Sequence, residues 1–306
     1  MSTDLLPALM AGLLWAISAP VINLGLAKVR KAQIDRPALL FFGLTTALVC
    51  GFFGIWIASG FASPIGELGW YVVLGGVFTF PIGTGLYYLA SAAYENRAAV
   101  ASQYANVKPV LSIGAGVVLF GEILAGRDYA VVALIVSGVA LMLIAAVRRE
   151  VHVVPVLLGL ALAFAWSAGE VFIRLAADGA SNMQLTLGAL FSALLITLPA
   201  AGLLALRRRA AGHRIGPVPA SAMAPFAVHG LLSFAGAYYF FFQSIGNIGL
   251  SKTIMVTVWW PALALVFDIG RRMVERRPLG LSWPTSLGLA FFLAAGIVHV
   301  WAPQAL

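Results

Sequence analysis

The sequence predicts an all-α integral membrane protein of ten transmembrane helices, built as two five-helix repeats that cross the membrane in opposite orientations. Three observations predict this fold class. The chain is too apolar for a soluble protein, its apolar runs have the length of membrane spans, and its second half repeats landmarks of its first half.

The composition excludes a soluble globular domain. Of the 306 residues, 61% are hydrophobic and 10% are charged, and the mean hydropathy is +0.98, whereas soluble domains are about half apolar and about a quarter charged. The net charge of +8 does not indicate nucleic-acid binding, because the basic residues lie in short loops rather than on a folded basic surface. The partner that this composition implies is the lipid bilayer. The single cysteine, Cys50, excludes an internal disulfide.

Ten apolar runs are long enough, at about 20 residues each, to cross a hydrocarbon core of about 30 Å. They lie at 4–27, 37–59, 68–93, 97–121, 128–147, 153–177, 183–206, 223–247, 249–269 and 283–302. The positive charges at Lys28, Arg30 and Lys31 follow the first run instead of preceding it, so we expect this run to be retained and not cleaved as a signal peptide.

The basic residues give these runs an orientation. Of the 19 Lys and Arg residues, 15 lie in or beside the odd-numbered loops, and loops rich in Lys and Arg stay in the cytoplasm. Both chain ends are therefore expected outside. Because five is an odd number of helices, the second half enters the membrane inverted relative to the first.

The two halves, 1–150 and 151–306, share landmarks at a nearly constant spacing. The spacing is 151 residues from Trp15 to Trp166, 152 from Pro109 to Pro261 and from Tyr87 to Tyr239, and 153 from Glu122 to Glu275. A slowly drifting offset is what a duplication with small insertions leaves behind. In an apolar chain, such a repeat is typical of transporters, which place one site between two related halves.

These features resemble the ten-helix, EamA-type branch of the drug/metabolite transporter superfamily. The resemblance rests on the paired tryptophans, on the stretches from Pro109 to Glu122 and from Pro261 to Glu275, and on Ser137-Gly138-Val139. It covers essentially the full chain and is closest to amino-acid exporters of the YddG type. It implies a multi-pass carrier of the bacterial inner membrane that moves small organic solutes by alternating access, often outward, with the fifth and tenth helices peripheral.

Lys108 and Glu170 are candidate substrate-binding residues. Counting ~1.5 Å per residue from Arg97 places Lys108 ~16 Å deep, near the bilayer midplane, where an ionisable side chain needs a partner or a water-filled cavity. Glu170 is a candidate partner for Lys108 and a candidate for coupling transport to protons. Arg174 is an alternative partner, since it lies one helical turn after Glu170. Lys108 also has a purely structural alternative as a buried, paired lysine.

Polar and aromatic residues at similar depth complete the candidate binding site. Besides Lys108 and Glu170, the predicted set comprises Trp15, Tyr87, Tyr88, Gln103, Tyr104, Trp166, Tyr239, Trp259 and Trp260. Trp260 occupies the repeat position of Lys108, so an indole and a cation are expected to face each other. Packing against lipid or protein is the alternative for each aromatic residue.

Pro81, Pro109 and Pro261 are predicted hinges, because proline removes a helical hydrogen bond. No catalytic site, metal site or cofactor is predicted. His229 and His299 each lie singly in an apolar run, without Cys, Asp or Glu at metal-ligand spacing. A membrane-embedded enzyme or lipid-handling protein is therefore disfavoured, since it needs a nucleophile with its base or a metal cluster.

The sequence thus favours a monomeric secondary transporter of a small polar or zwitterionic metabolite. Export of amino acids is the leading hypothesis, and protons are a candidate coupling ion. The alternative is an uptake carrier for a vitamin, nucleoside or sugar, in which the aromatic faces stack on the ring of the solute.

The orientation is tested with single cysteines at Ser2 and His213 after Cys50 has been replaced. Because these positions are predicted on opposite faces, an impermeant thiol reagent added outside intact cells should label the cysteine at position 2 and not the one at position 213. Labelling of both positions from one side would exclude the predicted topology.

Overall fold

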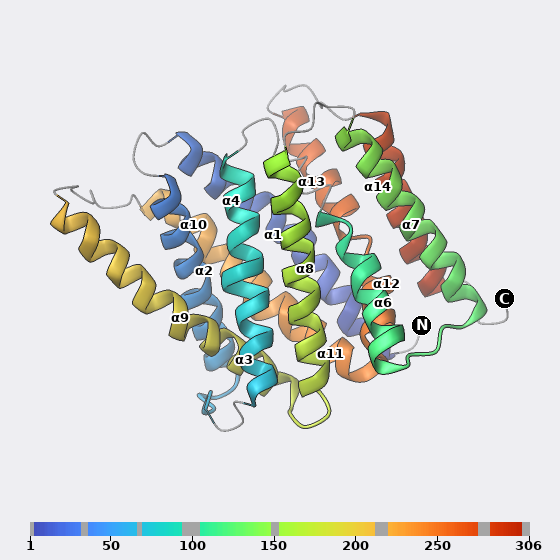
Figure 1. Cartoon of the computed structure of the whole chain (residues 1–306), viewed down its shortest axis with the longest axis horizontal. Helices are drawn as coiled ribbons and strands as arrows, with labels where there is room; N and C mark the ends of the chain where they lie inside the picture. Colours follow the sequence, from blue (N-terminus) through green and yellow to red (C-terminus); the bar gives the residue numbers. More distant parts are fainter. Residues whose placement is uncertain are drawn as a thin grey trace.

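The computed structural model describes residues 3–31, 36–65, 69–93, 105–147, 153–211, 220–274 and 282–301. In these residues the chain is a bundle of apolar helices (Figure 1). Nine helical stretches in the described part are long and apolar enough to cross a membrane, and a shorter one, Lys108–Phe120, belongs to the fourth predicted span. The all-helical membrane fold is confirmed. It follows from the bilayer, where every backbone polar group must be satisfied within the protein.

The helices of the first half follow the predicted spans closely. After a short turn, η1 (Thr3–Leu5), they are α1 (Leu6–Lys31), α2 (Arg36–Ala58), α3 (Trp70–Val77) with η2 (Phe78–Thr84) and α4 (Gly85–Ala93), α6 (Lys108–Phe120) and α7 (Gly126–Val147). The three segments α3, η2 and α4 together make the third span.

The second half has the same order of helices. They are α8 (Val153–Ala176), α9 (Asn182–Ala210), α10 (Ala220–His229) with η3 (Gly230–Ala237) and α11 (Tyr238–Ile248), α12 (Leu250–Thr257) with α13 (Trp260–Val274), and α14 (Trp283–Trp301). Figure 1 shows the N-terminus at the same end of the bundle as the ends of α6, α8 and α11.

The third and eighth spans each contain a π-helical turn at a corresponding position. Pro81 lies inside η2, whereas η3 contains no proline, so proline alone does not explain these turns. Phe80 in η2 and Phe234 in η3, 154 residues apart, contact each other with ring centroids 5.0 Å apart. Equivalent residues that touch each other are expected where a two-fold axis passes, which fits an inverted repeat.

Glycines allow the two halves to cross closely at two related places. A Cβ atom added at Gly76 in α3 would overlap the carbonyl oxygen of Ala189 in α9, and one added at Gly230 in η3 would overlap the carbonyl oxygen of Ala47 in α2. Small residues permit this backbone approach between membrane helices.

Helices α7 and α14 pack together at one side of the bundle (Figure 1). Gly138 and Gly288 meet where they cross, since a Cβ on either would lie within 2.9 Å of the other's carbonyl oxygen. Buried Asp128 and His299 join the same helices, with 3.2 Å between Oδ1 and Nδ1. The fold thus brings together two polar side chains that are far apart in sequence.

The crossing at Gly76 predicts that Gly76→Ala destabilises the protein. The added methyl group has to displace the backbone of α9, and overpacking of this kind lowers the free energy of unfolding by about 1–3 kcal/mol. Thermal unfolding of the detergent-purified protein measures this effect. Gly202→Ala in α9 is the control, because nothing lies within 4 Å of the added atom. An equal effect of both variants would contradict the close crossing.

Candidate functional site: a cavity between the two halves

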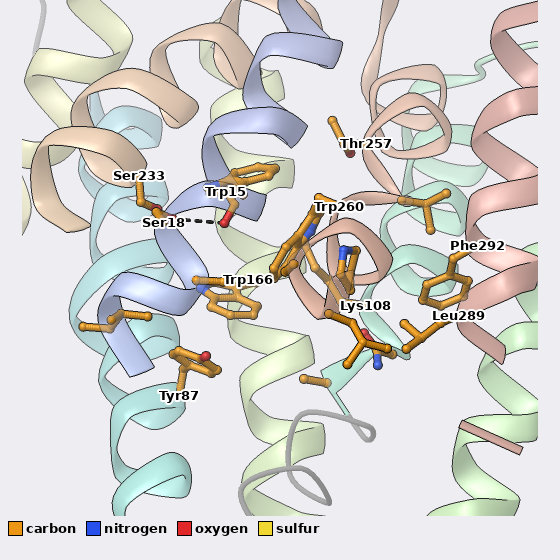
Figure 2. A pocket seen from close by; sticks show the side chains of 18 of the residues that line it. Trp15, Ser18, Tyr87, Lys108, Trp166, Ser233, Thr257, Trp260, Leu289 and Phe292 are labelled. Carbon is orange, nitrogen blue, oxygen red and sulfur yellow. Dashed lines mark hydrogen bonds between the residues drawn. The ribbon is translucent and has the colours of Figure 1, made fainter. Parts of the chain in front are cut away.

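A cavity of about 400 Å³ lies between helices of both halves. Figure 2 shows Trp15, Trp166 and Trp260 grouped around it with Tyr87, while Leu289 and Phe292 of α14 line another part of its wall. Hydroxyl and amide side chains are interspersed among these rings. They are Ser18, Asn23, Thr84, Asn106, Ser233, Thr257, Ser282 and Thr285. The wall is therefore mostly aromatic and apolar, with scattered hydrogen-bonding groups.

Two breaks in helices form part of this wall. The chain makes a two-residue turn at 106–107 before α6 begins at Lys108, and another at 258–259 before α13 begins at Trp260. Val107 and Val258 have similar backbone angles, with φ of −67° and −57° and ψ of −23° and −22°. The next residues, Lys108 with Pro109 and Trp260 with Pro261, all line the cavity. The predicted hinge prolines thus lie in the first turn of each new helix, where proline is tolerated.

Lys108 forms an ion pair with Glu170 of α8, joining its Nζ to Oε1 of the carboxylate. The Lys108 side chain is 18% exposed and that of Glu170 is 4% exposed. The Ser112 hydroxyl donates to Oε2 of Glu170 at 2.5 Å and lies 3.0 Å from the Ser167 hydroxyl. Both carboxylate oxygens therefore have partners, as a buried charge requires.

Aromatic faces surround the ammonium group of Lys108. Its Nζ lies 5.9 Å from the centroid of the Trp15 ring and 5.4 Å from that of Phe241. Trp260 packs next to Trp15 with the rings tilted and the centroids 6.2 Å apart. The indole that faces the cation is thus that of Trp15, where the repeat predicted Trp260.

The π-helical turn η2 fixes the orientation of Trp166. The Trp166 indole nitrogen donates to the carbonyl oxygen of Thr79 at 3.1 Å, and the same oxygen accepts from the Thr84 hydroxyl at 3.2 Å. Gly83 leaves room for the ring, because a Cβ there would overlap it. Tyr87, one helical turn after Gly83, packs against Trp166 with the rings tilted and the centroids 5.9 Å apart.

The remaining predicted site residues lie elsewhere or are not described. Tyr88 is 1% exposed and packs edge-on against Phe226 at 5.4 Å. Tyr239 packs on Phe240, and the Trp259 ring fills the space beside Gly12 and Gly296. These three do not line the cavity. Gln103, Tyr104 and Glu275 lie outside the described residues.

Arg174 does not pair with Glu170, contrary to the local alternative. Its guanidinium lies 2.8 Å from Asp178 and 3.9 Å from Glu122. Glu170 is turned toward α6 instead, so helix packing decides between the two possible partners of this carboxylate.

Some polar lining residues, among them His229, Asn23 and Ser233, were missed in the sequence. Tyr238, whose predicted depth matches that of the aromatic residues in the candidate site, also lines the cavity and contacts Trp15, with centroids 5.3 Å apart. No sequence signal distinguishes His229 or Asn23 from isolated polar residues that pack within a helix bundle.

Comparisons with known proteins agree with this architecture. Residues 3–144 match the EamA-like transporter family. A crystal structure of another protein superposes with a TM-score of 0.66 and 20% identity, covering 98% of this chain and 97% of that chain; at this identity the likeness shows a common fold. A search of curated proteins gave no match.

The ion pair predicts a non-additive double-mutant cycle. Lys108→Met leaves the Glu170 carboxylate buried without its counter-ion, which lowers the free energy of unfolding by about 3–5 kcal/mol. The double variant Lys108→Met/Glu170→Gln removes both charges and should recover much of this loss. Denaturation in detergent measures the free energy of unfolding of the wild type, of both single variants and of the double variant. Additive losses would show that the two side chains do not interact.

Proposed function

Because residues 3–144 belong to the EamA-like transporter family, and so to the drug/metabolite transporter superfamily, we propose that this membrane transporter exports amino acids or similar zwitterionic metabolites. The cavity is the binding site, and transport proceeds by alternating access between the repeats 1–150 and 151–306. The proposal puts the carrier, as a monomer, in the inner membrane of a bacterium.

One observation carries the choice of substrate, namely the ion pair that joins Lys108, which lines the cavity, to Glu170, which lies behind it and does not itself line the cavity. Among the described residues that line the cavity, Lys108 alone carries a full charge, and that charge is already neutralised. A solute with a single charge would bind one member of the pair and leave the other buried without a partner, which is costly. A zwitterion satisfies both members, with its carboxylate on Lys108 and its ammonium group near Glu170.

The rest of the cavity suits a small solute with an apolar part. Its volume of about 400 Å³ is at the lower end of the range of about 300–1,000 Å³ that is common for small-molecule sites. The faces of Trp15, Trp166 and Trp260 offer apolar contact and attraction for a cation, and the neighbouring hydroxyls offer hydrogen bonds. Lys108 occupies a position where the resemblance to amino-acid exporters leads us to expect an aromatic residue, so an aromatic amino acid is not the favoured substrate.

Proton coupling through Glu170 completes the proposed mechanism. The charged form of a carboxylate is disfavoured in a desolvated site unless a cation is near. When the substrate carboxylate takes Lys108 as its partner, Glu170 has to find the substrate amine or take up a proton. A proton bound in one orientation of the carrier and released in the other would drive the solute against its gradient.

A second candidate function is uptake of a vitamin, nucleoside or sugar. The grouping of three indoles with Tyr87 around one cavity (Figure 2) supports it, because such faces can stack on a ring. In this candidate function the solute is uncharged, so Lys108 and Glu170 stay paired with each other during transport.

Counterflow in proteoliposomes tests both the substrate class and the coupling. Wild-type protein should exchange amino acids, and Lys108→Met should lose this exchange by about tenfold or more at equal amounts of folded protein, since a missing charge partner is worth at least about 1.4 kcal/mol. An imposed pH gradient should drive net flux in the wild type, whereas any exchange that Glu170→Gln retains should not respond to the gradient.

Three outcomes would count against the proposal. Exchange of ring-containing neutral solutes but not of amino acids would favour the second candidate. Full exchange by Lys108→Met would reduce Lys108 to a structural residue. A wild type that ignores the gradient, or a Glu170→Gln variant that still follows it, would remove Glu170 from the coupling mechanism.

A further inference from the structure

A carboxylate of the first half binds the beginning of a helix in the second half. Glu122, just after α6, accepts hydrogen bonds from the backbone N–H groups of Leu250 at 2.6 Å and Ser251 at 2.7 Å, one to each of its oxygens. These are the first two residues of α12. A negative charge at a helix N-terminus is favourable, and hydrogen bonds to an ionised acceptor are stronger than neutral ones.

Two glycines shape the chain for this contact. Gly121 ends α6 in the left-handed conformation, with φ of 64°, and the N–H of Glu122 returns to the carbonyl oxygen of Gly116 at 3.2 Å. This ending turns the Glu122 side chain toward α12. Gly249 has φ of 86°, and a Cβ there would lie 2.7 Å from a carboxylate oxygen of Glu122. Glycine is thus required at 249 both for its backbone angle and for the space it leaves.

Arg174 adds α8 to the same contact. Its Nε lies 3.9 Å from Oε1 of Glu122, and its guanidinium lies 5.5 Å from the centroid of the Phe120 ring. Asp178 holds the other side of the guanidinium at 2.8 Å. The ends of α6 and α8 and the beginning of α12 are therefore joined by charged groups.

This cluster lies at one end of the bundle, and the cavity extends toward the other end. Lys108, on the cavity wall, is the first residue of α6, and Glu122 follows the end of this helix, so the 13 residues of α6, or about 20 Å of helix, separate the two. Beyond Lys108, the lining continues to Asn23, Asn106, Ile269 and Ser282, toward the end of α13 and the beginning of α14. Neither Glu122, Arg174 nor Ser251 lines the cavity, so this cluster lies between the cavity and the side of the bundle where α6 and α8 end.

We propose that Glu122, with Arg174 as its positioning residue, is the gate that closes the cavity toward the face that carries both chain ends. This inference rests on the proposed transport by alternating access. Opening that face requires α6 of the first half to separate from α12 of the second. The separation breaks both hydrogen bonds of Glu122 at once, so this carboxylate sets the balance between the two orientations of the carrier.

The gate is tested by the accessibility of a cysteine in the cavity. Ala19 lines the cavity on α1, and Ala19→Cys is introduced after Cys50 has been replaced by alanine. Vesicles of each orientation are treated with an impermeant thiol reagent. Glu122→Gln should raise the labelling rate from the face of the chain ends by about tenfold, a shift that corresponds to about 1.4 kcal/mol, and should lower labelling from the opposite face. Arg174→Gln should shift both rates in the same directions by a smaller factor.

Asp178→Asn is the matched control. It removes a negative charge from Arg174 at the same end of the bundle, but this carboxylate is 82% exposed, and exposed ion pairs contribute little. Its labelling pattern should stay that of the parent. Unchanged labelling in Glu122→Gln, or an equal rise from both faces, would overturn the gate, since a merely loosened fold exposes the cysteine in both directions. If Glu122→Gln does not fold, Arg174→Gln decides by the same criterion. Labelling needs no substrate, so a failure of the proposed substrate in counterflow is distinguished from a failure of the gate.

Discussion

The cost of holding a charge within hydrocarbon is the constraint on which the site depends. Lys108 lies where an unpaired ammonium group is expensive, so α6 and α8 have to pack with Glu170 facing it. The hydroxyl of Ser112 and the ring of Trp15 complete the surroundings of the pair. The groups of the proposed binding site are thus the same groups that make the folded helices tolerable in a bilayer.

The same constraint joins the two halves. Among the described residues, three contacts between ionisable side chains connect the first half with the second: Lys108 with Glu170, Asp128 with His299, and Glu122 with Arg174. Apolar packing between helices has little directional preference, whereas these contacts fix which residues face each other. They differ in position. One lies at the cavity, one lies between the peripheral helices α7 and α14, and one lies near the chain ends, so a rearrangement that breaks one of them can leave the others intact.

The spans could be predicted because they depend on length and hydropathy alone, and those of their ends that fall within the described residues agree with the structure within a few residues. Counting residues predicted that Lys108 lies near the bilayer midplane and needs a partner. Counting did not predict the partner of Glu170, since it depends on how α6 and α8 are rotated. Tyr87 and Tyr88 have the same predicted depth, yet one lines the cavity and the other packs against Phe226. The depth of a residue in the membrane depends on its position in the sequence, whereas the direction in which its side chain points depends on how the helices pack.

Glu122 illustrates the other limit of the sequence. Its recurrence as Glu275 made it a landmark of the repeat, but its partners in α12 are backbone N–H groups, which every residue except proline carries. No pattern of side chains could have identified them. Only the structure shows that this glutamate, just after the end of α6, accepts hydrogen bonds from the beginning of α12.

The π-helical turns in the third and eighth spans have a consequence for how such a cavity can change. A π turn accommodates about one residue more than an α-helical turn, so the irregularity is encoded in the length of the span as well as in its composition. Each residue of an α-helix turns the chain by about 100°. Loss of one residue from η3, which contains no proline, would therefore turn a different face of α11 toward the solute. Insertion or deletion of a single residue can in this way remodel the wall of the cavity without any substitution among the other residues.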